Sequence, residues 1–364
     1  MATMAPPRPA QIMEPDPQKL EDFMHKIVGD MAAAMSGSLV VTGMKLGLYK
    51  ALSDIGPATS ADLAKHLELD ERYVREWLSA QAASGFVDYN AADRRFSINA
   101  EQRMALSNED SPVYVAPAFE LIASTYIDEP KITEAFRTGA GVGWHEHHEC
   151  MFRGCEKFFR PGYRANLVAG WIPALQDVFD KLKNGAKVAD IGCGHGASTI
   201  IMAEAFPKSE FIGFDYHDKS IERAREAARE AGDPPNVRFE LSSAKDAPGG
   251  DFDLVCCFDC LHDMGDPVGA ARHVRDMLKP DGTFMIVEPR AGDDLTDNLN
   301  PVGRMYYAAS TMICTPGSKA QEVGLALGAQ AGEARLSEVL REAGFSKVRR
   351  ATETPFNMVI EARP

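Results

Sequence analysis

Three closely spaced glycines with an acid on either side are the residues of this chain best placed to hold a ligand. Gly192, Gly194 and Gly196 follow an apolar run that contains Asp190, and a second apolar run ends at Asp215. Glycine has no Cβ, so such a turn lets the backbone bend sharply and lets a ligand lie against it. An acid at the end of the next strand can accept hydrogen bonds from ribose hydroxyls. The pattern predicts a strand, a turn, a helix and a second strand that bind an adenosine-containing cofactor.

The glycine spacing leaves two cofactor classes open. It reads G-x-G-x-G, and the third glycine of the dinucleotide fingerprint would fall at Ala197, where alanine is tolerated. An NAD-dependent reductase is therefore one alternative. The segments VADIGCGHG and FIGFD, however, resemble motif I and the acidic loop of class I S-adenosylmethionine-dependent methyltransferases. This resemblance implies that the turn holds the methionine part of the cofactor and that Asp215 holds its ribose.

Further cofactor contacts are expected where the other strands end, because ligands of open α/β sheets bind beyond the carboxyl ends of the strands. Many relatives carry an acid at the position of Ser243, near the adenine, and a serine can still form a hydrogen bond there. The residues predicted to bind the cofactor are Asp190, Gly192, Cys193, Gly194, Gly196, Asp215, Tyr216, Ser243, Ala244 and Asp259.

His262 follows the fourth predicted strand and is the predicted general base. The segment LHDMGDP resembles the H-D-W-x-D segment of plant-type O-methyltransferases, in which that histidine is the catalytic base, with Met264 in place of tryptophan. A phenol has a pKa of about 10, so roughly one molecule in a thousand is ionised at pH 7, a shortfall of about 4 kcal/mol. A neutral histidine beside the hydroxyl offsets much of it, within the roughly 10²–10⁴-fold of general bases.

Carboxylates near His262 are expected to support it. Asp263 directly follows it and is predicted to be a catalytic residue that orients the imidazole, with a solvated carboxylate as the alternative. In plant-type relatives a later carboxylate supports the histidine, and Glu288, Asp293 and Asp294 are the candidates here. The sequence does not choose among these three.

Two groups of histidines and cysteines could in principle bind a metal or take part in redox chemistry, but neither role is predicted for them. The first comprises His145, His147, His148 and Cys150, whose spacing fits no structural zinc pattern. The second is the C-x-x-C pair Cys257 and Cys260, at the end of an apolar run where buried cysteines act as small hydrophobes. The odd count of seven cysteines gives no disulfide framework and indicates a reducing cytoplasm. No metal is predicted.

Aromatic side chains crowd the segment before the glycine turn. They are interpreted either as core packing or as the wall of a pocket for a flat, apolar substrate. Methionines and aromatics after the fifth strand likewise suit an adaptable pocket wall or plain packing. The residues predicted to contact substrate are Trp144, Phe159, Tyr163, Met305 and Tyr306.

Composition narrows the partner classes. The chain has 364 residues, enough for two domains, and its 45% hydrophobic and 25% charged content is ordinary for a soluble globular protein. The formal net charge of −14 argues against a nucleic-acid partner, because phosphate binding needs clustered Lys and Arg. From the sequence we expect no apolar run of membrane-spanning length and therefore no membrane partner.

Four regions are expected along the chain. The sequence predicts a disordered tail over residues 1–17 and a winged-helix dimerisation domain over residues 18–103. It predicts a helical linker or substrate cap over residues 104–185 and the S-adenosylmethionine-binding domain over residues 186–364. The second region resembles the N-terminal dimerisation domain of bacterial and plant small-molecule O-methyltransferases, which implies a homodimer. Asp70, Glu71 and Glu76 on its would-be recognition helix would repel phosphates.

The predicted fold is α/β, with a Rossmann-like seven-stranded class I methyltransferase sheet and an N-terminal all-α/winged-helix domain. The resemblance implies a dimeric S-adenosylmethionine-dependent methyltransferase acting on a hydroxyl oxygen of a small aromatic or hydrophobic metabolite, and the cysteine count indicates a cytoplasmic location. A winged-helix transcriptional regulator that senses S-adenosylmethionine is one alternative. Transfer to nitrogen, carbon or sulfur is another, because the cofactor motif is common to all four acceptors.

Overall fold

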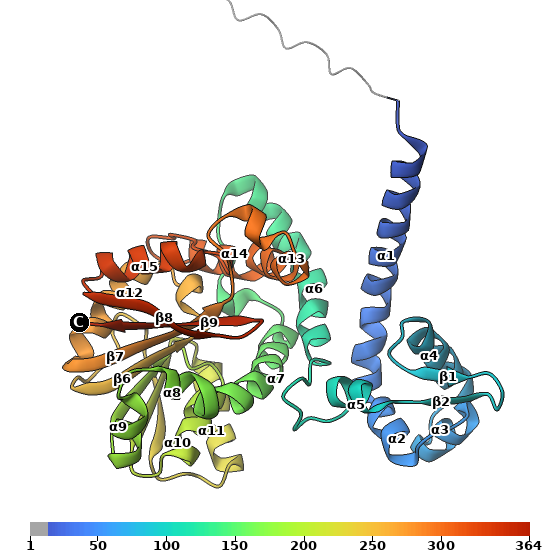
Figure 1. Ribbon diagram of the computed structural model, residues 1–364, viewed down its shortest axis with the longest axis horizontal. Helices are drawn as coiled ribbons and strands as arrows, with labels where there is room; N and C mark the ends of the chain where they lie inside the picture. The colour runs from blue at the N-terminus through green and yellow to red at the C-terminus, as the bar shows by residue number, and fades with distance from the viewer. Residues whose placement is uncertain (1–13) are drawn as a thin grey trace, which may run out of the picture. The chain divides into compact units, whose positions relative to one another are not determined.

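The structure is a computed structural model that describes residues 14–364, and its contacts divide the chain into two units, up to Gln102 and from Arg103 onward (Figure 1). Residues 1–13, most of the predicted tail, lie outside the described residues. The four regions expected from the sequence stay predictions.

The first unit is helical with one small hairpin. Thr59 caps the third helix in a capping box with Asp62, and the Asp70 side chain accepts a hydrogen bond from the Tyr73 N–H at the start of the fourth. These caps fix where the two central helices begin. The elements are α1 (Pro17–Lys45), α2 (Leu48–Ile55), α3 (Ser60–Leu67), α4 (Glu71–Ala83) and the antiparallel strands β1 (Asp88–Asn90) and β2 (Arg95–Ser97).

The long first helix corrects one expectation. In the described chain, α1 is long and apolar enough to cross a membrane by length and composition alone, which contradicts the judgement that no run approaches that length. A single helix of this kind is weak evidence for a span, because buried core helices of soluble proteins and signal sequences near the N-terminus pass the same test. Most of its apolar residues are exposed.

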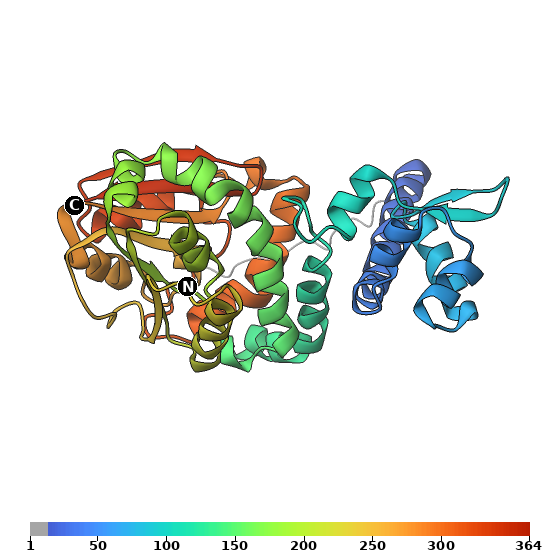
Figure 2. The same cartoon turned by 90° about the horizontal axis from the view of Figure 1, so that it is seen from below.

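Helices precede the sheet in the second unit. They are α5 (Ala100–Leu106), which crosses the boundary between units, α6 (Ala118–Thr138), η1 (Trp144–Glu146), α7 (Glu149–Asn166), η2 (Leu167–Trp171), α8 (Ile172–Ala174) and α9 (Val178–Asn184). The helices α6 and α7 lie side by side (Figures 1 and 2). They approach closely at Gly154, where a Cβ would lie 2.5 Å from the Leu121 nitrogen. Glycine is therefore required at this crossing.

Seven strands form one sheet in the order β5-β4-β3-β6-β7-β9-β8. The neighbouring pairs from β5 to β7 are parallel, and β9 pairs antiparallel with both β7 and β8. The strands are β3 (Lys187–Ile191), β4 (Glu210–Asp215), β5 (Val237–Leu241), β6 (Phe252–Phe258), β7 (Leu278–Pro289), β8 (Lys347–Glu353) and β9 (Asn357–Arg363). The order reverses at β3, which pairs with β4 on one side and β6 on the other. The predicted fold class is confirmed.

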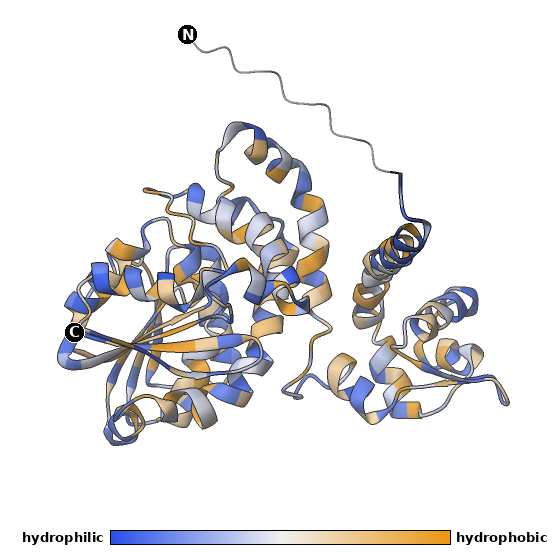
Figure 3. Ribbon diagram, turned by 45° about the horizontal axis from the view of Figure 1, so that its top comes forward, coloured by the Kyte–Doolittle hydropathy of each residue, from blue (hydrophilic) through white to orange (hydrophobic). Residues whose placement is uncertain are grey.

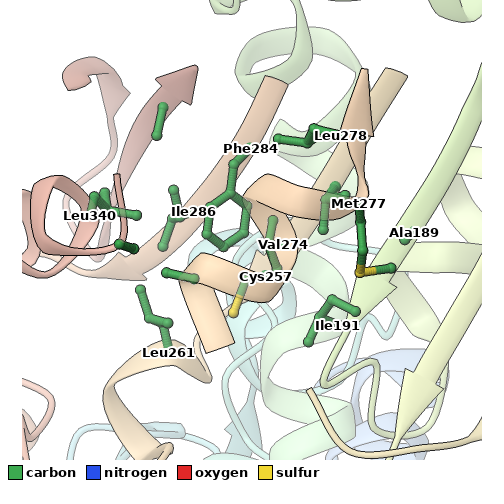
Figure 4. Packing of buried hydrophobic residues seen from close by; sticks show 14 of the residues in the cluster. Ala189, Ile191, Cys257, Leu261, Val274, Met277, Leu278, Phe284, Ile286 and Leu340 are labelled. Atoms are coloured by element: carbon green, nitrogen blue, oxygen red, sulfur yellow. The ribbon is translucent and has the colours of Figure 1, made fainter. Parts of the chain in front are cut away.

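Both faces of the sheet are buried. Along β6, Val255 and Cys257 pack on one face with Val274 and Leu340, as Figure 4 shows for part of the cluster, whereas Leu254 packs on the other. Helices α12 (Pro267–Met277) and α15 (Gly332–Glu342) contribute to the first layer, and α10 (Ala197–Ala205) to the second. Burial on both faces explains the mostly hydrophobic colour of the central strands in Figure 3.

The remaining elements connect the strands of the sheet. The segment between β7 and α15 is largely helical. The elements are α11 (Asp218–Glu230), η3 (Leu261–Asp263), η4 (Leu295–Asn298), α13 (Pro301–Ala309), η5 (Ser310–Cys314) and α14 (Thr315–Lys319). The η5 segment is one turn of π-helix.

Candidate active site

A cavity of about 460 Å³ lies at the carboxyl edge of the sheet. Residues that follow β3, β4, β5 and β6 line it, together with residues of α7 and of the segment 313–322. This is the edge where strand order reverses, the usual ligand position in open α/β sheets.

The glycine turn is held open by Asp215. The Gly194 N–H donates to Oδ2 of Asp215 at 2.9 Å, and the His217 N–H donates to Oδ1 at 2.8 Å. Gly192 has a φ of 70°, and a Cβ there would lie 2.6 Å from Sγ of Cys260. Burial raises the pKa of Asp215, and these N–H donors counter that effect by stabilising its charge.

Asp190 lies beneath the turn and does not line the cavity. Its Oδ2 accepts hydrogen bonds from the hydroxyls of Ser198 and Thr199, each at 2.7 Å. Burial raises the pKa of Asp190 to about 6. Within residues 14–364 its buried Oδ1 has no hydrogen-bond partner.

The other predicted cofactor residues mostly face the cavity. Those that line it are Gly192, Cys193, Gly194, Asp215, Tyr216, Ser243, Ala244 and Asp259. Gly196 does not line it. Gly196 is the N-cap of α10 and has a φ of 80°, and a Cβ there would lie 2.6 Å from the Phe239 ring. Its glycine is therefore needed for the backbone turn into α10 rather than for contact with a ligand.

His262 lies between two carboxylates. It is 3% exposed, and its Nδ1 is hydrogen-bonded to Oε2 of the buried Glu288. Its Nε2 lies 3.1 Å from Oδ1 of Asp263, which lines the cavity. Glu288 is also fixed, because its Oε1 accepts a hydrogen bond from the Leu261 N–H at 2.9 Å.

Of the three carboxylates that the sequence left open, Glu288 is the one in contact with His262. Asp293 instead accepts a hydrogen bond from the Ala334 N–H at 2.8 Å, and Asp294 precedes η4 as its cap. Burial disfavours a charge on His262, but Asp263 and Glu288 outweigh it and raise the pKa of His262 well above its ordinary value.

The half-buried Asp259 forms a second polar centre at the cavity wall. Its Oδ2 accepts a hydrogen bond from the Tyr163 hydroxyl at 3.1 Å and its Oδ1 from the Asn357 amide at 2.8 Å. Burial and the nearby Glu288 charge raise the pKa of Asp259 to about 8. With both oxygens engaged, Asp259 joins α7 to β9 as well as facing the cavity.

Three of the five predicted substrate residues line the cavity, namely Trp144, Phe159 and Tyr163. Met305 and Tyr306 do not, and the Tyr306 hydroxyl donates to the Phe356 carbonyl at 2.9 Å, which indicates a packing role. Several other residues line the cavity and were not predicted from the sequence: Phe152, Glu156, His195, Lys245, Gln321 and Glu322. The aromatic cluster pointed to Phe152, whereas no motif marks Gln321 or Glu322.

The histidine cluster that precedes α7 is engaged in local structure. Nδ1 of His147 lies 3.1 Å from Oδ2 of Asp128, and Nδ1 of His148 accepts a hydrogen bond from the Cys150 N–H. In the C-x-x-C pair, Cys257 is buried whereas Cys260 lines the cavity, with their Sγ atoms 2.8 Å apart.

Comparison with known families identifies the two parts of the chain. Residues 182–344 match the model described as a methyltransferase domain, and residues 33–108 match the one described as an Rv2258c-like winged HTH domain. Residues 182–344 are a methyltransferase domain. The resemblance predicted from the sequence is therefore confirmed, and the alternative of an NAD-dependent reductase has no support from this match.

Individual relatives agree with this assignment. The chain is 34% identical over 139 residues to 27-O-demethylrifamycin SV methyltransferase of Amycolatopsis mediterranei, which covers 36% of this chain and 51% of that protein. The chain spans about half the length of the curated relatives it matches first.

Solved structures share the fold over nearly the whole chain. Human N-acetylserotonin methyltransferase in complex with S-adenosylmethionine has a TM-score of 0.71 at 16% identity and covers 93% of this chain and 97% of its own. Mitomycin 7-O-methyltransferase has a TM-score of 0.65 at 20% identity and covers 95% and 100%. At these identities the likeness establishes the fold.

S-adenosylmethionine is the cofactor of this methyltransferase domain, and the residues at the carboxyl edge fit it. The turn at Gly192 and Gly194 leaves bare backbone beside the cavity, and Asp215 lines the same wall with acceptor capacity beyond its two N–H donors. We propose that Asp215 holds the ribose and that the turn holds the methionine part.

Replacing Asp215 with alanine is expected to weaken cofactor binding by about 10- to 150-fold, because hydrogen bonds to a charged group contribute about 1.5–3 kcal/mol. Isothermal calorimetry with S-adenosylhomocysteine measures the change. Asp218→Ala, an exposed acid three residues on, is the matched control and should bind as the parent does. Equal affinities for the parent and the Asp215 variant would contradict the assignment.

Proposed function

We propose that this protein transfers the methyl group of S-adenosylmethionine to a hydroxyl oxygen of a small, aromatic or hydrophobic metabolite, with His262 as the general base. The observation that supports this most directly is the buried His262–Glu288 contact. Neither residue lines the cavity itself, and His262 adjoins it through Asp263, which does. The wall residues Trp144, Phe159 and Tyr163 suit a flat, apolar acceptor.

Each residue near His262 has a part in this proposal. Nδ1–H of His262 donates to Glu288, which leaves Nε2 as the atom that takes the proton of the acceptor hydroxyl. When bound, the cofactor supplies an electrophilic methyl group on its sulfonium. Asp263 stabilises the imidazolium that results, since its Oδ1 lies 3.1 Å from Nε2. Positioning of the acceptor in line with the methyl group supplies much of the acceleration.

We propose further that the protein is a cytoplasmic homodimer formed through its N-terminal unit. The support is a series of exposed apolar side chains on one side of α1, at spacings of three and four residues: Leu20, Phe23, Met24, Val28, Met31 and Met35. An exposed stripe of this kind is typical of a surface that another helix covers.

The surface of α4 supports a DNA-binding regulator less well than it supports a methyltransferase. Arg72 is ion-paired with Glu76 and Arg75 with Glu71, so both arginines of this helix are neutralised by acids on the same helix. A duplex would have to displace these partners and would meet the acids themselves.

His262→Ala is expected to lower kcat/KM for a phenol by roughly 10²–10⁴-fold, the range typical of losing a general base. An acceptor that is already a good nucleophile, such as a thiolate, does not need the base and should lose much less. A methyl-release assay across phenols, amines and thiols makes the comparison. Equal turnover of every acceptor by parent and variant would remove His262 from the mechanism.

Asp263→Asn is expected to shift the pH profile of kcat/KM to lower pH. A base must be neutral, so activity with a phenol rises as pH passes the pKa of His262, which the Asp263 charge raises. Removing that charge lowers the pKa and moves the rising limb downward. Asp293→Asn, a carboxylate away from His262, is the control and should leave the limb in place. A limb that moves upward, or not at all, contradicts the assignment.

The double variant Phe23→Glu and Met31→Glu is expected to give monomers, because it puts charges at two apolar positions of the proposed interface. Light scattering should report about 39.7 kDa in place of twice that mass. Gln18→Glu with His25→Glu adds the same residues at exposed polar positions of α1 and should stay dimeric. A monomeric parent protein would overturn the dimer.

A further inference from the structure

Three potential metal ligands of different chemistry meet beside the cavity, and one of them, Asp263, lines it. His262 and Asp263 belong to η3, and Cys314, 51 residues after Asp263, ends the π-helical turn η5. Their ligand atoms all lie within 4.8 Å of one another. Because η3 and η5 are far apart in sequence, no local motif places these side chains together.

The histidine is oriented as a metal-binding histidine usually is. Nδ1 of His262 is engaged by Glu288, so Nε2 is the nitrogen left to face Asp263 and Cys314. A carboxylate on the far nitrogen is the common second partner of a metal-ligating histidine, since it fixes the ring and raises its basicity. Glu288 is 1% exposed and is itself held by the Leu261 N–H.

A carboxylate oxygen lies directly beside this nitrogen. Oδ1 of Asp263 is buried and lies 3.1 Å from Nε2 of His262. Two ligands about 2.0–2.1 Å from one tetrahedral ion lie about 3.3 Å apart. The observed separation of these two atoms is therefore close to the spacing that a shared ion requires.

We propose that Nε2 of His262, Oδ1 of Asp263 and Sγ of Cys314 form a site for a borderline divalent cation of the zinc class. Nitrogen, carboxylate and thiolate ligands favour zinc or cobalt over magnesium or calcium, which take oxygen ligands. Three protein ligands leave one coordination position, and Asp263 lines the cavity from which a fourth ligand can reach it. On binding, the ion displaces the thiol proton of Cys314 and the proton that the imidazolium of His262 carries on Nε2, and both are released to solvent.

Metal binding at this site goes beyond the proposed function and opposes it. The ion occupies Nε2, the atom that the general base needs, so a bound zinc ion blocks proton transfer from a phenol. Zinc is thus expected to inhibit methyl transfer to phenols by occupying the base.

Titration of the metal-free full-length chain with Co²⁺ tests the site without any activity measurement. The expected result is one equivalent bound, with visible bands of tetrahedral cobalt and a near-ultraviolet thiolate-to-cobalt band, both lost on addition of Zn²⁺. Cys314→Ser should abolish the thiolate band. Cys150→Ser, a partly exposed cysteine in α7, is the matched control and should retain it.

Glu288→Gln provides a second measurement that does not alter a ligand. It should weaken cobalt binding by about 10- to 100-fold, the range seen when the partner of a ligating histidine is lost. The proposal is overturned by absence of the thiolate band in the parent chain, or by its persistence in Cys314→Ser. A chain that binds cobalt as described but methylates no acceptor would overturn the proposed function alone.

Discussion

The parallel pairing of β3 with both β4 and β6 is the constraint on which the site depends. Asp190 is in register with Gly213 on one side and with Cys256 on the other. Strand order reverses at β3, so the loops that follow these strands diverge and leave space between them. The glycine turn, Asp215 and the segment from Asp259 to Asp263 all border that space because their strands end at the same edge.

A buried polar network next to this edge is costly unless every member is paired. Glu288 and His262 are both nearly inaccessible, and each would carry a large desolvation penalty as an isolated charge. Their mutual contact offsets that penalty, as do the Leu261 N–H and the nearby Asp263. Asp259 is stabilised separately by Tyr163 and Asn357. The same pairing that makes these groups tolerable in the interior gives His262 its direction and its raised pKa.

The proposed methyl transfer and the proposed metal site use one nitrogen in two ways. Nε2 of His262 is directed by Glu288 whether its partner is a proton or an ion. What differs is the thiol of Cys314, which a phenol acceptor does not need and a zinc ion does. The two proposals therefore make separate demands on the chain, although they share His262.

The sequence by itself determined the sheet, the glycine turn and the placement of His262 after β6, because these depend on local patterns. Alternating or continuous apolar runs mark strands, and G-x-G-x-G with acids on either side marks a cofactor turn. Asp190 shows the limit of such patterns, since a residue next to the turn can lie beneath it and bind Ser198 and Thr199 instead of facing the cavity.

Only the tertiary structure selected Glu288 from three candidate carboxylates, brought Cys314 to His262 and placed Gln321 at the cavity wall. These contacts join segments far apart in the chain. They are decided by how β7, η5 and the following loop pack against η3, and residue spacing along one chain carries no record of that packing.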